Sequence, residues 1–295
     1  MSEQHRAGMV AVVGRPNVGK STLLNALVGA KVSIVSRRPQ TTRHRIMGIV
    51  TRENMQIAFI DTPGFQAEHG GALNKLLNRS VTASLSGVDV VLWLVEAGRV
   101  GALDRRVLGL LPRDVPVIAG VSKVDRLKSR SQLLPFVQLV SGLYPFAEVV
   151  PFSALRGDNL DRLIEVIRPL LPVSPALYSA DTITDRSERF IAAEFIREKL
   201  FYALGEELPY SAAVVVDRFE EEGGLRRIYA SIIVDKDSQK SIVIGQKGER
   251  LKGIASRARR DMEALFGGKV YLEVWVRVKR GWADDARSLR ALGYE

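Results

Sequence analysis

Short apolar runs rich in β-branched residues alternate with amphipathic stretches over residues 9–171. Each apolar run is long enough for one buried strand, and the amphipathic stretches have the spacing of helices that bury one side. Strands that alternate with helices predict an α/β fold with a mostly parallel sheet and helices on both faces. The expected strands are 9–13, 46–50, 56–60, 88–95, 115–121 and 148–152, and the expected helices include 21–28, 131–143 and 159–171.

A proline-rich break separates this pattern from a second one. The break contains Pro172 and Pro175, and we place the first domain at 1–173 and a linker at 174–187. Beyond it the spacing predicts a helix at 188–204, strands at 212–219 and 226–234, a helix at 249–266 and a strand at 270–278. This order predicts an α+β domain over 188–280, followed by a tail at 281–295.

The first strand runs into a phosphate-binding motif at residues 14–21, of the form GxxxxGK[ST]. A strand, a glycine loop and a helix N-terminus form an anion site, because backbone N–H groups and the helix dipole face the same point. We expect Lys20 to reach the β- and γ-phosphates, Ser21 to bind magnesium, and Lys20 to face solvent when the site is empty. The candidate phosphate-binding residues are Gly14, Arg15, Pro16, Asn17, Val18, Gly19, Lys20, Ser21 and Thr22.

A second motif follows the strand 56–60, and it consists of Asp61, Thr62, Pro63 and Gly64. An Asp at the carboxyl end of a strand can hold magnesium through a water molecule, and the Gly64 N–H can bond a γ-phosphate. Loss of that phosphate would release the loop, as in a nucleotide switch.

Two further motifs predict that the base is guanine. Asp125, which follows Ser122 and Lys123, can accept hydrogen bonds from the N1–H and the exocyclic amine of guanine. Adenine lacks this arrangement, and a buried carboxylate without its partner disfavours the wrong base. After the strand 148–152, we expect the backbone of Ser153, Ala154 and Leu155 to contact the guanine carbonyl.

In this order the motifs resemble those of the P-loop GTPases. The resemblance implies hydrolysis of GTP to GDP with magnesium as cofactor. It implies Ser21 and Thr42 as direct magnesium ligands and Asp61 as a ligand through water, with Thr41 as the rival of Thr42. The catalytic group that it implies consists of Lys20, Asn17, Thr42 and Gly64.

Three positions qualify the resemblance. Ser122 stands where the family usually has Asn, and its shorter side chain can replace only part of the bonding to the phosphate loop. Phe65 stands where many GTPases carry a water-orienting Gln, so slow intrinsic turnover is expected. Asn17 implies potassium beside the phosphates, as in related GTPases, or only stabilises the turn; both readings stay open.

The second domain carries a GxxG motif at residues 245–248, between an apolar approach and a basic amphipathic helix. These residues resemble a type II KH domain, whose glycines let a sugar–phosphate backbone lie close to the loop. We expect Trp275, in the last strand, to be a core residue rather than a platform on which bases stack. The candidate RNA-binding residues are Ile244, Gly245, Gln246, Lys247, Gly248, Lys252 and Arg257.

Charge and composition agree with this interpretation. The 295-residue chain has a formal net charge of +10, which favours a nucleic acid or an anionic membrane surface as partner. It has no Cys, which excludes disulfides and thiolate metal sites and fits a reducing cytoplasm. No signal peptide is visible, and the apolar stretch 88–95 is too short to span a bilayer.

The combination of a GTPase domain and a type II KH domain resembles the Era family of bacterial GTPases over essentially the whole chain. The resemblance implies binding of the 3′ end of 16S ribosomal RNA, a role in small-subunit assembly, and a cytoplasmic protein partly associated with the inner membrane face. No obligate protein partner is inferred. The alternative is an RNA-binding protein with an inert nucleotide domain. The stretches that carry the resemblance begin at Gly14, Pro39, Asp61, Ile183, Val243 and Gly281.

Overall fold

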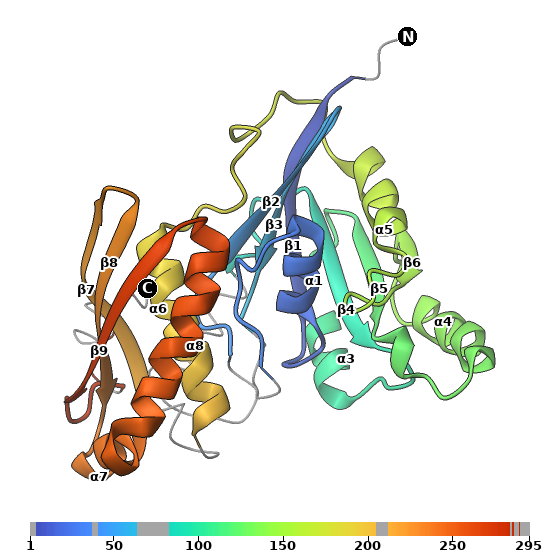
Figure 1. The fold of residues 1–295 in the computed structure, drawn as a ribbon. Helices are drawn as coiled ribbons and strands as arrows, with labels where there is room; N and C mark the ends of the chain where they lie inside the picture. The colour runs from blue at the N-terminus through green and yellow to red at the C-terminus, as the bar shows by residue number, and fades with distance from the viewer. Residues whose placement is uncertain are drawn as a thin grey trace. The chain divides into compact units, whose positions relative to one another are not determined.

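The computed structural model describes residues 4–36, 41–63, 83–204, 212–283, 285 and 289, which belong to two units (Figure 1). The first unit contains the described residues up to Ser33, those from Thr42 to Pro63, and those from Ala83 to Asp185. The second contains residues 34–36, Thr41 and the described residues from Arg186 onward. The predictions for Pro39, Gly64 and Phe65 lie outside the described residues.

Six strands of the first unit form one sheet in the order β2-β3-β1-β4-β5-β6. The strand β1 pairs parallel with β3 and β4, and β5 pairs parallel with β4 and β6. Only β2 runs antiparallel, because a two-residue turn joins it to β3. The strands are β1 (Arg6–Gly14), β2 (Ile46–Arg52), β3 (Met55–Asp61), β4 (Val90–Glu96), β5 (Val117–Ser122) and β6 (Glu148–Pro151). The predicted, mostly parallel sheet is confirmed.

Helices pack on both faces of this sheet. On one face, Trp93 of β4 is in the same buried cluster as Val107 and Val140, which belong to α3 and α4. On the other face, α1 approaches so closely that a Cβ on Gly48 would collide with Leu24. The described helices of this unit are α1 (Lys20–Val28), α3 (Ala102–Leu108), α4 (Leu133–Ser141) and α5 (Leu160–Ile167), with 3-10 turns at Val124–Arg126, Arg130–Gln132 and Arg168–Leu170.

The segment after the last of these turns is bonded to the first unit. The N–H of Ala7 donates to the Pro172 carbonyl, and the buried Gln56 side chain accepts from the N–H groups of Leu177 and Tyr178. Farther on, the N–H of Ile49 donates to the Ile183 carbonyl. Residues 172–183 therefore follow the first unit over much of the range that we assigned to a linker.

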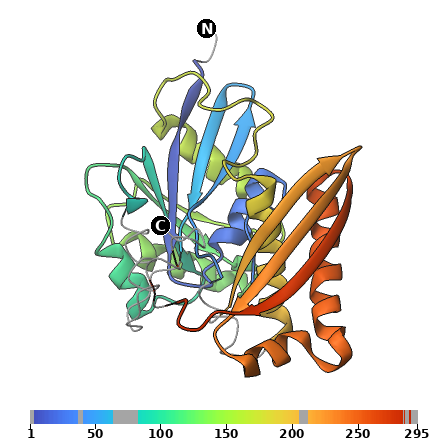
Figure 2. The ribbon, with the colours of Figure 1, turned by 90° about the vertical axis from the view of Figure 1, so that its left-hand side faces the viewer.

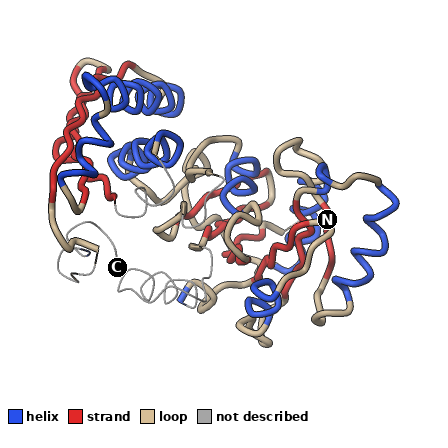
Figure 3. Tube along the Cα trace, turned by 90° about the horizontal axis from the view of Figure 1, so that it is seen from below, coloured by secondary structure: helices blue, strands red, loops and turns tan. Residues whose placement is uncertain are grey.

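The second unit has a three-stranded sheet in the order β7-β8-β9, drawn as a curved layer in Figure 2. The strands β7 and β8 form an antiparallel hairpin, and β8 and β9 are parallel. Helices α6 and α8 bury one side of the sheet in a shared core that contains Phe195 and Ile254 (Figure 3). The elements are α6 (Glu188–Ala203), β7 (Ala212–Glu222), β8 (Leu225–Val234), α7 (Asp237–Ile244), a 3-10 turn (Gln246–Gly248), α8 (Glu249–Phe266) and β9 (Lys269–Val278).

Trp275 lies on the other side of this sheet, so the prediction of a core residue is wrong. Its neighbours Val274 and Val276 belong to the core cluster, and strand alternation turns the residue between them outward. Trp275 is 41% exposed and stacks on Tyr229 with the ring centroids 6.1 Å apart. Aromatic stacking on the open face of the sheet takes the place of core packing.

Residues 34–36 and Thr41 pack within the second unit, against α6. Ile34 is buried in its core, and the N–H of Val35 donates to the Glu198 carboxylate at 3.0 Å. The Tyr202 hydroxyl donates to the Val35 carbonyl at 2.8 Å, and the Arg197 guanidinium donates to the Thr41 carbonyl at 2.5 Å. A stretch of chain between two parts of the first unit is thus anchored to a helix of the second. Among the described residues, no helix is both long and apolar enough to cross a membrane.

Candidate nucleotide and RNA sites

The phosphate loop connects β1 to α1 through a sharp turn that depends on backbone conformation. Asn17 has φ +60° and Gly19 has φ +114°, and Gly19 is the residue before the first turn of α1. A Cβ on Gly14 would lie 2.8 Å from the Leu94 carbonyl, so a larger residue does not fit. The turn directs the N-terminus of α1, where helix N–H groups have no partner within the helix, toward the loop, as expected for a phosphate site.

Lys20 is buried, which contradicts the expectation that it faces solvent. Its ammonium folds back over its own loop and donates to the carbonyls of Gly14 at 3.0 Å and Arg15 at 3.2 Å. These two bonds replace water around the charge. Burial lowers the pKa of Lys20 to about 8, although the nearby Asp61 opposes the shift.

Three side-chain oxygens meet beside Lys20. The Ser21 hydroxyl lies 2.9 Å from the Thr42 hydroxyl and donates to Asp61 Oδ2 at 2.6 Å. Asp61 is fully buried, and its Oδ1 atom has no hydrogen-bond partner. Burial raises the pKa of Asp61, against the charge of Lys20 and the hydroxyl hydrogen bonds. Hydroxyl and carboxylate oxygens are ligands that magnesium prefers, so this set fits that ion.

The structure separates Thr42 from its rival Thr41. The Thr42 hydroxyl lies beside Ser21, whereas the Thr41 hydroxyl bonds Ser36 at 2.5 Å in the second unit. Thr62 donates to the Val12 carbonyl and holds the end of β3 against β1. Of the second motif, Asp61, Thr62 and Pro63 are described, and Gly64 is not.

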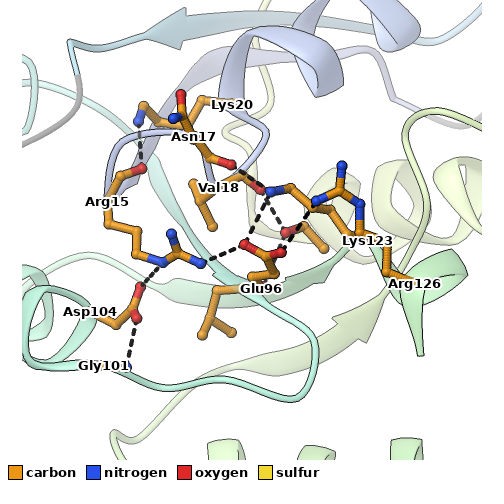
Figure 4. Close-up of polar contacts among 11 residues, drawn as sticks. Arg15, Asn17, Val18, Lys20, Glu96, Gly101, Asp104, Lys123 and Arg126 are labelled. Atoms are coloured by element: carbon orange, nitrogen blue, oxygen red, sulfur yellow. Dashed lines mark hydrogen bonds and ion pairs between the residues drawn. The ribbon is translucent and has the colours of Figure 1, made fainter. Parts of the chain in front are cut away.

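The base loop is tied to the phosphate loop by two side chains, of which Figure 4 shows Lys123. The Ser122 hydroxyl donates to the Val18 carbonyl at 2.7 Å, and the Lys123 ammonium donates to the Asn17 carbonyl at 2.6 Å. Ser122 therefore makes a direct bond between the loops despite its short side chain. The hydroxyl has one hydrogen to donate, so it supplies one such bond at a time.

The remaining base-site residues are close to Asp125. Its Oδ1 atom accepts a hydrogen bond from the Ser153 hydroxyl at 2.6 Å, which orients the carboxylate. Ser153 is buried and pairs through its backbone with Asp158, while Leu155 is exposed at the tip of the turn between them. The structure thus places Asp125 next to Ser153, the first residue of the predicted base-binding segment Ser153–Leu155.

Glu96 belongs to the same region, and sequence reasoning missed it. It lies at the carboxyl end of β4 and accepts hydrogen bonds from Arg15 and Lys123. The residue belongs to no recognised motif. The available signal was its position, since ligand sites form at the carboxyl ends of parallel strands.

In the second unit, the GxxG loop turns the chain from α7 into α8. Gly245 has φ +73° and Gly248 has φ +79°, and the turn between them includes Lys247 at φ +49°. A Cβ on Gly245 would lie 2.7 Å from the Arg250 Cβ, whereas one on Gly248 would meet nothing within 4 Å. Gly245 is needed for close packing, and Gly248 for its backbone conformation.

The predicted RNA-binding side chains surround this loop. Val243 and Ile254 are buried and anchor α7 and α8 to the core. Ile244 is half-buried, and the polar candidates project from the surface: Gln246, Lys247, Lys252 and Arg257 are all exposed. A close backbone approach lined with cations is the arrangement that a sugar–phosphate chain requires.

Two family patterns match this chain. One, described as a 50S ribosome-binding GTPase, covers residues 9–123. The other, described as a KH domain, covers residues 207–283. The matches fall on the two units that carry the nucleotide motifs and the GxxG loop.

Full-length relatives are similar throughout. GTPase Era of Nitrosomonas eutropha is 55% identical over 291 residues, covering 99% of this chain and 98% of the relative. GTPase Era of Chromobacterium violaceum is 55% identical over 288 residues, covering 98% and 97%.

Solved structures agree with these relatives. A variant of Aquifex aeolicus Era bound to GDP and AlF4− superposes with a TM-score of 0.94 at 38% identity, covering 98% of this chain and 99% of that one. Era in complex with MgGDPNP and nucleotides 1506–1542 of 16S ribosomal RNA gives the same TM-score, identity and coverage.

Proposed function

The chain belongs to the Era family of GTPases, and on that premise we propose that it is a switch which binds the 3′ end of 16S ribosomal RNA. In this role it assists assembly of the small ribosomal subunit and maturation of its RNA. The observation that carries the proposal is the full-length similarity to a solved relative that holds both MgGDPNP and a 16S fragment. The description of the GTPase pattern names the 50S subunit, but that pattern covers only residues 9–123.

In the proposed site, Lys20 and the N–H groups of the phosphate loop bind the phosphates. The Lys20 ammonium donates hydrogen bonds to two carbonyls of its own loop. Nucleotide binding replaces these two bonds by bonds to phosphate oxygens. The oxygens of Ser21 and Thr42 are the direct magnesium ligands, and Asp61 acts through water. Magnesium neutralises developing charge on the phosphates, which is the main requirement of phosphoryl transfer.

Asp125 selects guanine in this proposal. The Ser153 hydroxyl holds its Oδ1 atom, and Lys123 and Ser122 fix the loop against the phosphate side. The nucleotide is therefore bound between two loops that touch each other. This arrangement supports a working nucleotide site over an inert domain, because the described residues of the phosphate, magnesium and base motifs form bonded groups.

Potassium is a second proposed cofactor, through Asn17. Its backbone carbonyl accepts from Lys123 and its φ is +60°, so the residue also shapes the turn. If potassium contributes, single-turnover hydrolysis of GTP should be faster in potassium chloride than in sodium chloride of equal ionic strength. Equal rates would assign Asn17 to the turn alone.

We further propose a cytoplasmic protein that associates in part with the inner membrane face. The net charge of +10 favours anionic surfaces, whether phosphates of RNA or lipid headgroups. Sedimentation with anionic and with neutral vesicles tests the membrane part, and equal sedimentation with both would contradict it.

The experiment that tests the main proposal combines RNA binding with turnover. An RNA that ends in the 16S 3′ sequence is titrated onto the GTP-analogue-bound protein, with a scrambled RNA of equal length as control. GTP hydrolysis is then measured with and without the same RNAs. Equal affinity for both RNAs would overturn the proposed RNA target, whereas absence of hydrolysis would overturn the switch.

A further inference from the structure

Glu96 lies between the phosphate loop and the base loop, and the functions assigned above do not use it (Figure 4). Its carboxylate accepts from Arg15 Nη2 at 2.5 Å and from Lys123 Nζ at 3.0 Å. Arg126 Nη1 lies 3.6 Å from its other oxygen. One carboxylate at the end of β4 therefore joins cations from two separate nucleotide-binding loops.

Arg15 is held from a second side as well. Its Nε atom lies 3.4 Å from Oδ1 of Asp104, a fully buried carboxylate whose Oδ2 accepts from the Gly101 N–H at 2.8 Å. The Arg15 side chain thus runs from the phosphate loop to β4 and the start of α3, away from the Lys20 ammonium (Figure 4). Arg15, the residue after Gly14, therefore has a hydrogen-bonded ion pair with Glu96 and a longer ion pair with Asp104.

Lys123 depends on Glu96 in a similar way. Its ammonium donates to the Asn17 carbonyl and to Glu96, and its backbone has φ +58°, which is uncommon for a residue other than glycine. Such a conformation persists when surrounding contacts hold it. Without the carboxylate, the lysine keeps the Asn17 contact but loses its charged partner.

The charge state of Glu96 suits this role. Burial alone would raise its pKa, but the hydrogen bonds and charges of Lys123 and Arg15 outweigh burial and lower the pKa. The group is therefore ionised at neutral pH. A half-buried carboxylate with several cations is a stronger link than an exposed ion pair, because water screens it less.

We propose that Glu96 is a positioning residue for guanine nucleotides, acting through Lys123 and Arg15. It fixes the base loop and the phosphate loop to the end of one strand. Asp125 and the phosphate-binding N–H groups can then bind the same nucleotide at the same time. Preorganisation of this type slows dissociation without adding a contact to the ligand. The oxygens of Ser21, Thr42 and Asp61 are bonded to one another, so we expect Glu96 to affect nucleotide dissociation much more than hydrolysis of bound GTP.

The test uses the full chain with Glu96→Gln, which keeps the shape and removes the charge. Dissociation of a fluorescent GDP should become about tenfold faster, which corresponds to loss of one charge-assisted hydrogen bond. Single-turnover hydrolysis at saturating GTP should stay within about twofold of the native rate. The matched control is Glu148→Gln on β6, which removes an exposed carboxylate paired with Arg162 and should change neither quantity.

A second readout separates positioning from general destabilisation. GDP and inosine diphosphate differ by the exocyclic amine that Asp125 is proposed to read, and the native protein should prefer GDP. Glu96→Gln should reduce this preference several-fold, because a displaced base loop reads the base poorly. Glu96→Asp, which keeps the charge but is one methylene shorter, should give an intermediate result and serves if the Gln variant does not fold.

The two possible failures are distinguishable, since the inference rests on the proposed assignment of Lys123 and Asp125 to the base. A native protein without preference for GDP over inosine diphosphate would overturn that assignment. A native preference that Glu96→Gln leaves intact, or equal losses for both nucleotides, would overturn the role of Glu96 alone. In a double-mutant cycle with Lys123→Met, strict additivity would also count against it.

Discussion

Lys20 is a charged group in a buried position, and its protonation should control nucleotide binding. Its pKa of about 8 is set by burial, and phosphates require the charged form. Affinity for GDP should be constant below about pH 8 and fall by up to about tenfold per pH unit above it, because one proton must be taken up on binding. Titration with a fluorescent GDP between pH 7 and pH 9 measures this, and a flat profile would show that Lys20 does not carry the interaction.

Lys20 also makes the stability of the nucleotide-free protein depend on pH. Affinity for GDP falls as the pH rises, whereas this contribution to stability increases. An unfolded lysine has a pKa of 10.5, so between about pH 8 and 10.5 the unfolded chain holds a proton that the folded chain lacks. The contribution of Lys20 to the free energy of unfolding therefore rises with pH through this window. Lys20→Arg is the control for both measurements, because its charge persists throughout.

Asp125 should determine which base is bound. Asp125→Asn replaces one acceptor oxygen by a donor amide, so the preference should move from guanine toward xanthine, whose carbonyl accepts from that amide. We expect loss of GDP affinity on the order of a hundredfold or more, as for sites built around one hydrogen-bonding group. Competition of GDP and xanthosine diphosphate for the variant checks this. If the variant kept the native preference for GDP, Asp125 would not be the group that binds the base.

The conformation of the phosphate loop was predictable from the sequence, because the motif places glycines such as Gly14 where the turn requires them. The burial of Lys20 was not, since it depends on two carbonyls of its own loop that accept its ammonium. Glu96 was equally hidden. Its proposed role depends on cations from two loops that are distant from it in the sequence, Arg15 in one and Lys123 and Arg126 in the other, and no local pattern encodes this.

At the scale of elements, the turn from α7 into α8 should bind RNA through close approach and charge. Gly248→Asp places a negative charge at the N-terminus of α8, where a phosphate is expected. Its Cβ would meet nothing within 4 Å, so the cost to the fold is limited to the strain of a side chain at φ +79°. RNA affinity should fall by on the order of tenfold or more, because a charge-assisted contact becomes repulsive. Fluorescence anisotropy with an RNA ending in the 16S 3′ sequence measures the loss.

Gly248→Asn is the matched control for this element. It has nearly the same shape, carries no charge, and like Asp tolerates a positive φ such as the +79° found here. We expect it to lose much less RNA affinity than the Asp variant, with GDP binding native in both. Equal losses would attribute the effect to the backbone or to bulk rather than to charge.

Element order and sheet type followed from the sequence because hydrophobic period and turn residues are local. The buried side of β9 also follows from alternation, but our prediction for Trp275 rested on its residue type alone. Residues 270, 272, 274, 276 and 278 are all Val or Leu, whereas the alternate series includes Lys269, Glu273 and Arg277, so Val274 and Val276 take the side covered by α6 and α8. Trp275 is left on the open side, where Tyr229 supplies a stacking partner from the neighbouring strand.

At the scale of the whole chain, one segment connects the nucleotide site to the RNA-binding unit. Ser33 and Thr42 lie beside Asp61 and Ser21 in the first unit, and the described residues between them are anchored to α6 of the second. The anchors are the buried Ile34 and the hydrogen bonds of Val35 and Thr41 to Glu198, Tyr202 and Arg197. If nucleotide exchange changes the conformation of residues 34–36 or Thr41, their contacts with α6 change too, and α6 packs in the KH core.

We expect this segment to couple the two ligands, with the GTP form binding RNA more tightly than the GDP form. Linkage requires that RNA tighten GTP binding, relative to GDP, by the same factor. Tyr202→Phe removes one anchor, and since Tyr202 is 56% exposed the fold should be little affected. The coupling factor should fall about threefold, the value of one ordinary hydrogen bond.

Tyr271→Phe, which removes an exposed hydroxyl bonded to Glu273, is the control. Titrations of RNA with GDP and with a non-hydrolysable GTP analogue measure the factor for each protein. Identical RNA affinity in both nucleotide states would mean two independent binding modules on one chain, and a factor unchanged by Tyr202→Phe would remove this anchor from the pathway.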